Sequence, residues 1–172
     1  MTSATGWSWG SAWGDDALDD QEDEAGGRVY ASSKDCLVLL LDAGKQMFQG
    51  GGQPEDVPFA LCLKCVKSVL LNKIISSEKD LVGVVLYGTA KSQNKSDFKH
   101  VYVLQDLDTP DAPRIKEIED MLSAQSLQNL SASFGHSDDY SMSDVLWTCS
   151  NMLSDSVSKN SHKRIILFTN QR

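Results

Sequence analysis

Apolar and polar positions form two kinds of segment from about residue 35 onward. Short, nearly continuous apolar runs predict strands over residues 36–42, 80–87, 101–104 and 164–169, the third a short edge strand. Helical spacing of apolar residues predicts helices over residues 58–75, 114–122 and 141–153, and Pro58 and Pro113 suit the first turns of two of them. The Ser/Gln/Asn-rich stretch after residue 122 is expected to be a loop. This alternation favours an α/β fold with an open, mostly parallel twisted sheet, right-handed crossovers and helices on both faces.

The first apolar run ends abruptly on a carboxylate, in Cys36-Leu-Val-Leu-Leu-Leu-Asp42. Parallel strands covered on both faces have such runs, and open α/β sheets bind ligands at the carboxyl edge of their strands. We therefore expect Asp42 at a ligand crevice. Its side chain would either hold a metal ion or cap the following turn by accepting hydrogen bonds from loop amides.

A metal site at this edge needs hard oxygen ligands from three loops. The strand resembles that of von Willebrand factor A-type domains, whose metal motif continues as Asp-x-Ser-x-Ser. Gly44 and Gln46 occupy the two hydroxyl positions, Tyr140 falls where such domains place a threonine, and Asn170 replaces an aspartate. One carboxylate with amides makes a poor magnesium site, so we predict a degenerate site with no metal and no cofactor.

Net charge and cysteine usage divide the chain unevenly. Residues 1–28 hold seven acids and one base, and so carry −6 of the formal net charge of −8. With few aliphatic residues, they are predicted to be a disordered acidic tail, and residues 29–172 are near neutral. No apolar run approaches the roughly 20 residues that span a bilayer, so no membrane association is expected. The four cysteines are expected to be reduced thiols of a cytosolic or nuclear protein.

Other candidate chemistry is sparse. Cys62 and Cys65 lie inside a helical pattern, where a core or semi-buried position is favoured over a redox or zinc pair. The three histidines are isolated from any nucleophile, and His136, in a Gly/Ser/Asp loop, is expected to be solvated. Lys34, just before the first strand, is the one candidate for a Schiff-base lysine. The one basic cluster is a candidate for phosphate contact through Lys159, Lys163 and Arg164.

Several specific strings resemble the N-terminal A-type domain of the Ku family over about residues 28–172. They include Lys34-Asp-Cys-Leu-Val-Leu-Leu-Leu-Asp-Ala-Gly-Lys-Gln-Met-Phe48, Asp139-Tyr-Ser-Met-Ser-Asp-Val-Leu-Trp147 and Ser161-His-Lys-Arg-Ile-Ile-Leu-Phe-Thr-Asn170. The resemblance implies a nuclear protein that binds DNA double-strand-break ends, pairs with a larger Ku subunit and recruits end-joining factors. It also implies roles in non-homologous end joining and telomere maintenance.

Two family activities, ATP-dependent DNA helicase and lyase action on 5′-deoxyribose phosphate or abasic ends, are also implied. Tyr30 stands where the family has a lysine linked to the lyase, and Lys34 replaces a nearby arginine. The A-type sheet normally continues beyond its fourth strand, so residues 29–172 are expected to be a partial domain whose last strand is an exposed apolar edge. We expect an interaction scaffold without DNA-end binding of its own. A lyase using Lys34, or a metal-dependent ligand-binding domain, remains the alternative.

Overall fold

A computed structural model describes residues 34–50, 52, 56–155 and 161–171. The acidic tail predicted for residues 1–28 and the candidate Lys159 lie outside the described residues. Four strands form one sheet in the order β3-β2-β1-β4. Their bounds are β1 Lys34–Asp42, β2 Leu81–Tyr87, β3 Val101–Asp108 and β4 Ser161–Phe168. The described helices are η1 Lys45–Phe48, α1 Pro58–Ser76, α2 Ala112–Met121, α3 Ala124–Phe134 and α4 Met142–Asp155.

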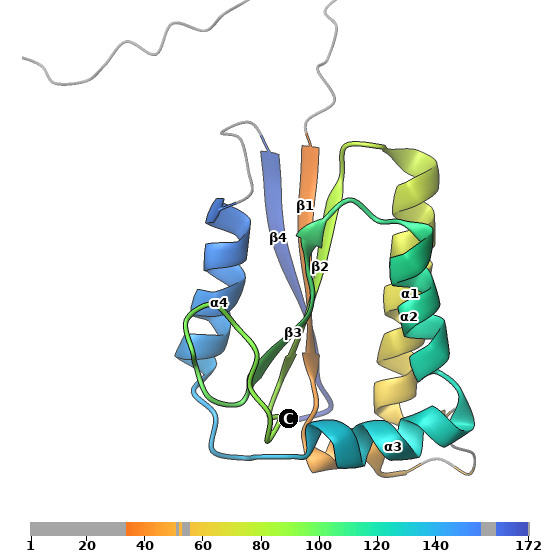
Figure 1. Cartoon of the computed structure of the whole chain (residues 1–172), viewed down its shortest axis with the longest axis vertical. Coiled ribbons are helices and arrows are strands. Elements are labelled where there is room, and N and C mark those ends of the chain that lie inside the picture. Colours follow the sequence, from red (N-terminus) through yellow and green to blue (C-terminus); the bar gives the residue numbers. More distant parts are fainter. Residues whose placement is uncertain (1–33, 51, 53–55, 156–160, 172) are drawn as a thin grey trace, which may run out of the picture. The chain divides into compact units, whose positions relative to one another are not determined.

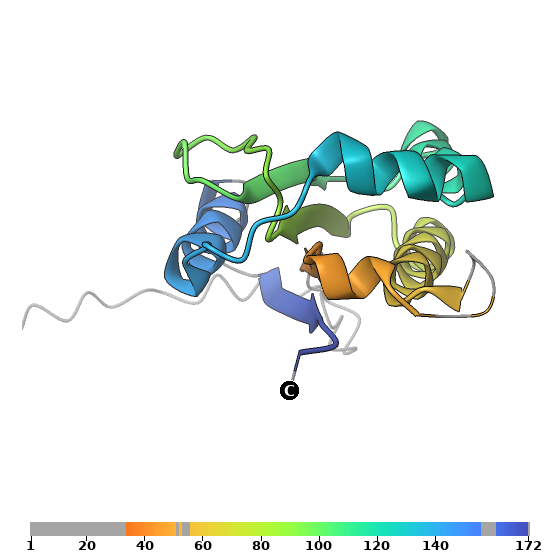
Figure 2. The same cartoon turned by 90° about the horizontal axis from the view of Figure 1, so that it is seen from below.

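Helices cover both faces of the sheet, as predicted. Helices α1 and α2 lie on one face and α4 lies on the other (Figures 1 and 2). Alternate β1 residues enter two separate cores, because successive side chains of a strand point to opposite faces. Leu37, Leu39 and Leu41 pack in the core of α1 and α2, whereas Val38 and Leu40 pack in the core of α4. This double burial explains why the β1 sequence is continuously apolar.

The described sheet is mostly parallel, as predicted, and strand β3 is longer than predicted. Strand β1 pairs in parallel with β2 and β4, whereas β2 pairs antiparallel with β3. A parallel return normally needs a crossover helix, and residues 88–100 form none. Strand β3 also continues to Asp108. In its second half, the exposed Asp106 and Asp108 alternate with the buried Gln105 and Leu107, and the pairing with β2 contains a bulge.

The polar stretch after α2 is a helix and not the predicted loop. Within α3, Leu127 and Phe134 are buried and Leu130 is half-buried, all on the α1 and α2 side of the sheet. Their spacing of three and four residues is helical. The prediction was wrong because tertiary burial of three apolar side chains outweighs a composition that is otherwise typical of loops.

An ion cluster fastens the amino end of the sheet. Lys73 of α1 donates to Asp35 Oδ2 and to Asp80 Oδ2, both at 2.6 Å. Arg164 of β4 donates to both carboxylate oxygens of Asp35. Partial burial raises the pKa of Asp35, but the hydrogen bonds from Arg164 and Lys73 outweigh it and hold that pKa below its usual value. The cluster therefore joins β1, β4, α1 and the residue preceding β2.

Strand β4 is an open edge of the sheet, as predicted. Only β1 pairs with it among the described strands. Its side chains Ile165, Ile166 and Leu167 are 38%, 39% and 47% exposed. An edge strand leaves one row of backbone donors and acceptors without strand partners, and here that row lies beside apolar side chains.

Candidate functional site

The carboxylate of Asp42 is fully buried and is bonded inside the protein. Its Oδ1 accepts a hydrogen bond from the Gly44 amide at 2.8 Å, and its Oδ2 accepts one from the Thr169 hydroxyl, also at 2.8 Å. The Thr169 hydroxyl in turn accepts from the Gln171 amide at 3.0 Å. This arrangement is the structural alternative considered for Asp42, and it ties the loops after β1 and β4 together.

Gly44 lies against the carboxylate that its amide binds. A Cβ atom at residue 44 would lie 2.9 Å from Asp42 Oδ1, closer than Cβ atoms approach. A serine there would require the carboxylate or the loop to shift. The position that would hold a metal-binding hydroxyl is therefore part of the carboxylate's own cap.

The other residues of the predicted degenerate site also meet at the carboxyl edge. Asn170 Nδ2 donates to the Gln46 carbonyl at 3.3 Å, and the Tyr140 hydroxyl donates to Gln171 Oε1 at 3.5 Å. Two adjoining hollows lie here, of about 250 and 570 Å³. The first is lined in part by Asp42, Gly44 and Gln46, and the second by Gln46, Tyr140 and Asn170.

These residues do not fit a divalent cation. The central carboxylate is buried and held by the Gly44 amide and the Thr169 hydroxyl, and the predicted positions around it hold Gly44, Gln46, Tyr140 and Asn170 in place of hydroxyl and carboxylate ligands, whereas a divalent cation needs several hard oxygen ligands. Within the described ranges, no group of three or more His, Cys, Asp or Glu side chains is placed to hold a metal. Every buried side-chain nitrogen or oxygen in that part of the chain has a hydrogen-bond partner.

His136 is a structural residue that sequence reasoning placed in solvent. Its Nδ1 lies 2.7 Å from the Ala43 carbonyl and its Nε2 lies 2.7 Å from the Ser131 hydroxyl. Its ring centroid is 5.0 Å from that of Phe48. The expectation of a solvated ring was wrong because a contact across 93 residues leaves no local pattern in the sequence. His136 thereby joins α3 to the loop after β1.

Asp138, Thr169 and Gln171 are residues of this edge that the sequence analysis did not select. Asp138 and Gln171 line both hollows. Thr169 lies directly after β4, at the edge where loops of a parallel sheet form the ligand crevice. Its position after a predicted strand is the one feature of the sequence that could have indicated a role at this edge. The carboxyl edge is thus a polar surface whose side chains mostly bond to one another.

The remaining candidates lie at the opposite end of the sheet. Lys34 is the first residue of β1, and its partner in the strand pairing is Ser161 at the start of β4. Lys163 is exposed. The Arg164 guanidinium is 54% exposed but is paired with Asp35, so it is already committed to an internal carboxylate. Of the candidates for phosphate contact, Lys163 is therefore the one described residue that forms no ion pair with another described residue. Lys34 and Asp42 lie at opposite ends of β1 and so belong to different sites.

Both cysteines of the predicted helical pair are on α1, as expected. Cys62 is buried, as expected, but Cys65 is exposed, so the expected core or semi-buried position was wrong for Cys65, which lies on the outer side of the helix; both are free thiols. Burial raises the pKa of Cys62 to about 11, which is the opposite of the low pKa that a redox cysteine needs.

No helix among the described residues is both long and apolar enough to cross a membrane.

Solved structures with a similar backbone arrangement include the SpRpn10 VWA domain. It has a TM-score of 0.48 and 13% identity over 81% of this chain and 61% of that one. The pilus adhesin RrgA of Streptococcus pneumoniae has a TM-score of 0.46 and 15% identity over 79% of this chain and 20% of that one.

Curated relatives match most of the chain. The chain is 46% identical to "X-ray repair cross-complementing protein 6" of Mus musculus, over 86% of this chain and 24% of that protein. It is 39% identical to "ATP-dependent DNA helicase 2 subunit 1" of Rhipicephalus appendiculatus, over 89% of this chain and 24% of that protein. It is 38% identical to "ATP-dependent DNA helicase ku70" of Dictyostelium discoideum, over 81% of this chain and 16% of that protein. The chain thus spans about a quarter or less of these relatives' lengths.

The family model for the Ku70/Ku80 N-terminal alpha/beta domain matches residues 36–172, which include every described strand and helix apart from the first two residues of β1. That match agrees with the resemblance noted in the β1, α4 and β4 strings. The chain therefore belongs to the family of Ku70/Ku80 N-terminal alpha/beta domains.

Proposed function

We propose that the chain is the N-terminal domain of the smaller Ku subunit, acting as a protein-interaction scaffold in DNA double-strand-break repair. The observation that carries this proposal is the 46% identity with mouse "X-ray repair cross-complementing protein 6" across 86% of the chain. Relatives named as subunit 1 or ku70 support the smaller subunit in particular. The implied processes are non-homologous end joining and telomere maintenance.

The proposed partners are the larger Ku subunit and end-joining factors, and the proposed location is the nucleus. Binding of double-stranded DNA ends is assigned to the longer relatives and not to this segment. Affinity for DNA depends on cations placed to neutralise phosphates. Residues 29–172 have a net charge near −2, and the Arg164 guanidinium is paired with Asp35.

A scaffold role also suits the carboxyl edge, where open α/β sheets usually bind small ligands. Here the buried Asp42 carboxylate is satisfied by Gly44 and Thr169. Contacts to other proteins would then be made by outer faces of the helices and by the sheet edges.

Binding of a fluorescein-labelled linear 30-base-pair duplex to the 172-residue chain tests the first part of this proposal. Fluorescence anisotropy at 100 mM salt should show no end-dependent binding at micromolar protein. A duplex of the same sequence whose two ends are closed by hairpin loops is the control for non-specific phosphate contact. Tight binding to the linear duplex alone would overturn the proposed division between this segment and the longer relatives.

Recruitment to damage in cells tests the second part. The chain carrying a fluorescent tag should accumulate at laser-induced double-strand breaks, and depletion of the larger Ku subunit should reduce that accumulation. The tag alone is the control. Absence of any accumulation would refute a scaffold role in end joining, whatever the outcome of the duplex experiment.

A further inference from the structure

The carboxyl half of β4 has the side chains of an interior strand but lies at an edge of the sheet (Figure 2). Directly paired residues of neighbouring parallel strands place their side chains on the same face. Ile165 therefore lies beside Val38 on the α4 face, and Ile166 lies beside Leu39 on the α1 face. Leu167 returns to the α4 face, and all three β4 side chains are exposed. This half of the edge strand is apolar on both faces, so it lacks the polar face of a solvated edge.

The amino half of β4 is protected against pairing with another chain. His162, Lys163 and Arg164 are exposed there, and charged side chains on an edge strand, lysine above all, oppose association with a further strand. The stretch from Ile165 to Phe168 contains neither a charged residue nor a proline. The carboxyl half is therefore the part of β4 that is open to a new strand.

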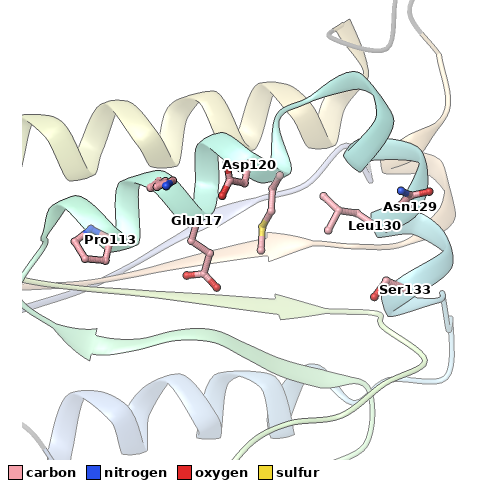
Figure 3. A pocket seen from close by; sticks show the side chains of 8 residues that line it. Pro113, Glu117, Asp120, Asn129, Leu130 and Ser133 are labelled. Carbon is pink, nitrogen blue, oxygen red and sulfur yellow. The ribbon is translucent and has the colours of Figure 1, made fainter.

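Further apolar surface adjoins this half of the edge. Thr148 lies on the flank of α4 that lines a hollow with Val103 of β3. Leu146 is two residues away and so about 200° around the helix. It therefore lies on the opposite flank, toward β4, because β3 and β4 are opposite edges of the sheet, and it is exposed. By contrast, the hollow of about 560 Å³ between α2 and α3 is bordered by polar side chains such as Glu117 and Asn129 (Figure 3). The α2–α3 surface is suited to solvent, whereas the β4 edge requires apolar cover.

We propose that a second copy of this chain supplies that cover, with β4 of each copy paired antiparallel about a two-fold axis centred on Ile166. The axis is perpendicular to the sheet, so α4 of both copies lies on one face and α1 of both copies lies on the other. Ile166 then faces its own counterpart, and Ile165 of each copy faces Leu167 of the other. Centring the axis on Ile165 would instead place Lys163 against Leu167, and centring it between two residues would set side chains of opposite faces against each other. The proposed register is the one that pairs all three exposed apolar side chains with one another.

Charge favours this antiparallel arrangement over association through parallel strands. In the proposed register Lys163 of each copy lies opposite Thr169 of the other, so the two basic segments lie at opposite ends of the interface. A parallel arrangement would set Lys163 beside its own counterpart, and like charges directly opposite each other destabilise a strand pair. A two-fold interface is also closed, because each β4 edge is covered by the other. The inference goes beyond the proposed scaffold function and does not depend on it.

Sedimentation equilibrium of the full 172-residue chain tests the proposal. From about 5 to about 200 µM, a range that covers weak interfaces, the mean mass should rise from the 18.9 kDa of one chain toward twice that value. A higher salt concentration should not weaken the association, because the interface contains no ion pair between copies.

Matched lysine substitutions locate the interface. I166K sets two ammonium groups against each other at the axis and should weaken the association at least about tenfold. The matched control I75K changes an exposed isoleucine near the end of α1 and should leave the association within about twofold of the parent. Circular dichroism will establish that each variant is folded.

A disulfide cross-link tests the register without adding charge to the edge. Cysteine variants are made in the background C65S, which removes the exposed native thiol. Cα atoms of directly opposite residues lie about 4.5–5.5 Å apart, which a disulfide can span. Air oxidation with copper phenanthroline should therefore link most I166C chains into dimers. I165C is the control, because its counterpart lies two residues away along the paired strands, and it should cross-link several-fold less.

Three results would overturn the proposed interface: the mass of a single chain at every concentration, species that grow beyond two chains, or cross-linking of I165C as efficient as that of I166C. Each result is independent of the duplex and recruitment experiments. A chain that dimerises through β4 yet fails to reach DNA breaks would contradict the proposed repair function and leave the β4 interface intact.

Discussion

Replacing Lys73 by methionine should destabilise the domain by about 3 kcal/mol at pH 7, because it removes the ammonium shared by two carboxylates. Both Asp35 Oδ2 and Asp80 Oδ2 lie 2.6 Å from Lys73 Nζ, and the three side chains are only 14%, 8% and 18% exposed. Two carboxylates about 5 Å apart repel by about 3 kcal/mol at an effective dielectric constant of about 20. Loss of one partner from a largely buried ion pair costs a similar amount, about 3–5 kcal/mol.

The pH dependence of this loss follows from the directions of the pKa shifts. Burial raises the pKa of Asp80, but the hydrogen bond from Lys73 outweighs it and lowers that pKa below its unfolded value, as for Asp35. Such groups contribute stability above an unfolded-state pKa of about 4, and the contribution is lost as pH falls through their folded-state pKa. The difference between parent and variant should therefore shrink between pH 5 and pH 2.

Urea unfolding followed by far-ultraviolet circular dichroism measures both quantities. The variant should show a lower midpoint with an unchanged slope against urea at pH 7. The matched control is Lys95→Met, because Lys95 is 77% exposed and lies 3.5 Å from Asp155. That control should cost less than about 1 kcal/mol. A Lys73→Met variant within about 0.5 kcal/mol of the parent, or a difference that persists unchanged at pH 2, would refute the assigned role of the cluster.

Three further predictions concern buried polar groups and thiols. Arg114→Met should cost about 2–3 kcal/mol and speed amide hydrogen exchange in β2 and β3, because two carbonyls of the bulge lose a charged donor; unchanged exchange there would contradict this role. Thr169→Val should cost about 1–2 kcal/mol in urea unfolding, since it removes one of the donors to the buried carboxylate at the end of β1; a neutral effect would show that the bond adds nothing. Iodoacetamide at pH 8, read by peptide mass spectrometry, should label exposed Cys65 first, while burial, which raises the pKa of Cys62 and of Cys149 to about 11, keeps those thiols unreactive in the folded chain; equal labelling of all three would be inconsistent with this packing.

Strands and long helices were predictable because their signals are local. The apolar run Leu37–Leu41 needs cover on both faces, and it has that cover from α1 and α4. Helix α1 was predicted from its first residue, Pro58, to within one residue of its end.

The missed features depend on contacts between distant residues. The α3 helix exists because three apolar side chains reach the core beneath α1 and α2. Strand β3 continues beyond residue 104 because Gln105 and Leu107 are buried in the folded domain.

The sequence by itself determined the layered α/β architecture, the family and the presence of Asp42 at the carboxyl edge. These follow from local periodicity and from specific strings of residues. Only the tertiary structure decided what Asp42 does, because Thr169 lies 127 residues away along the chain and Gly44 closes on the carboxylate only in the folded loop. The same holds for Lys73, which joins Asp35 across 38 residues. Hydrophobic patterning determines secondary structure through residues close together in the sequence. The partner of a buried charge depends instead on how the helices and strands pack in the folded domain.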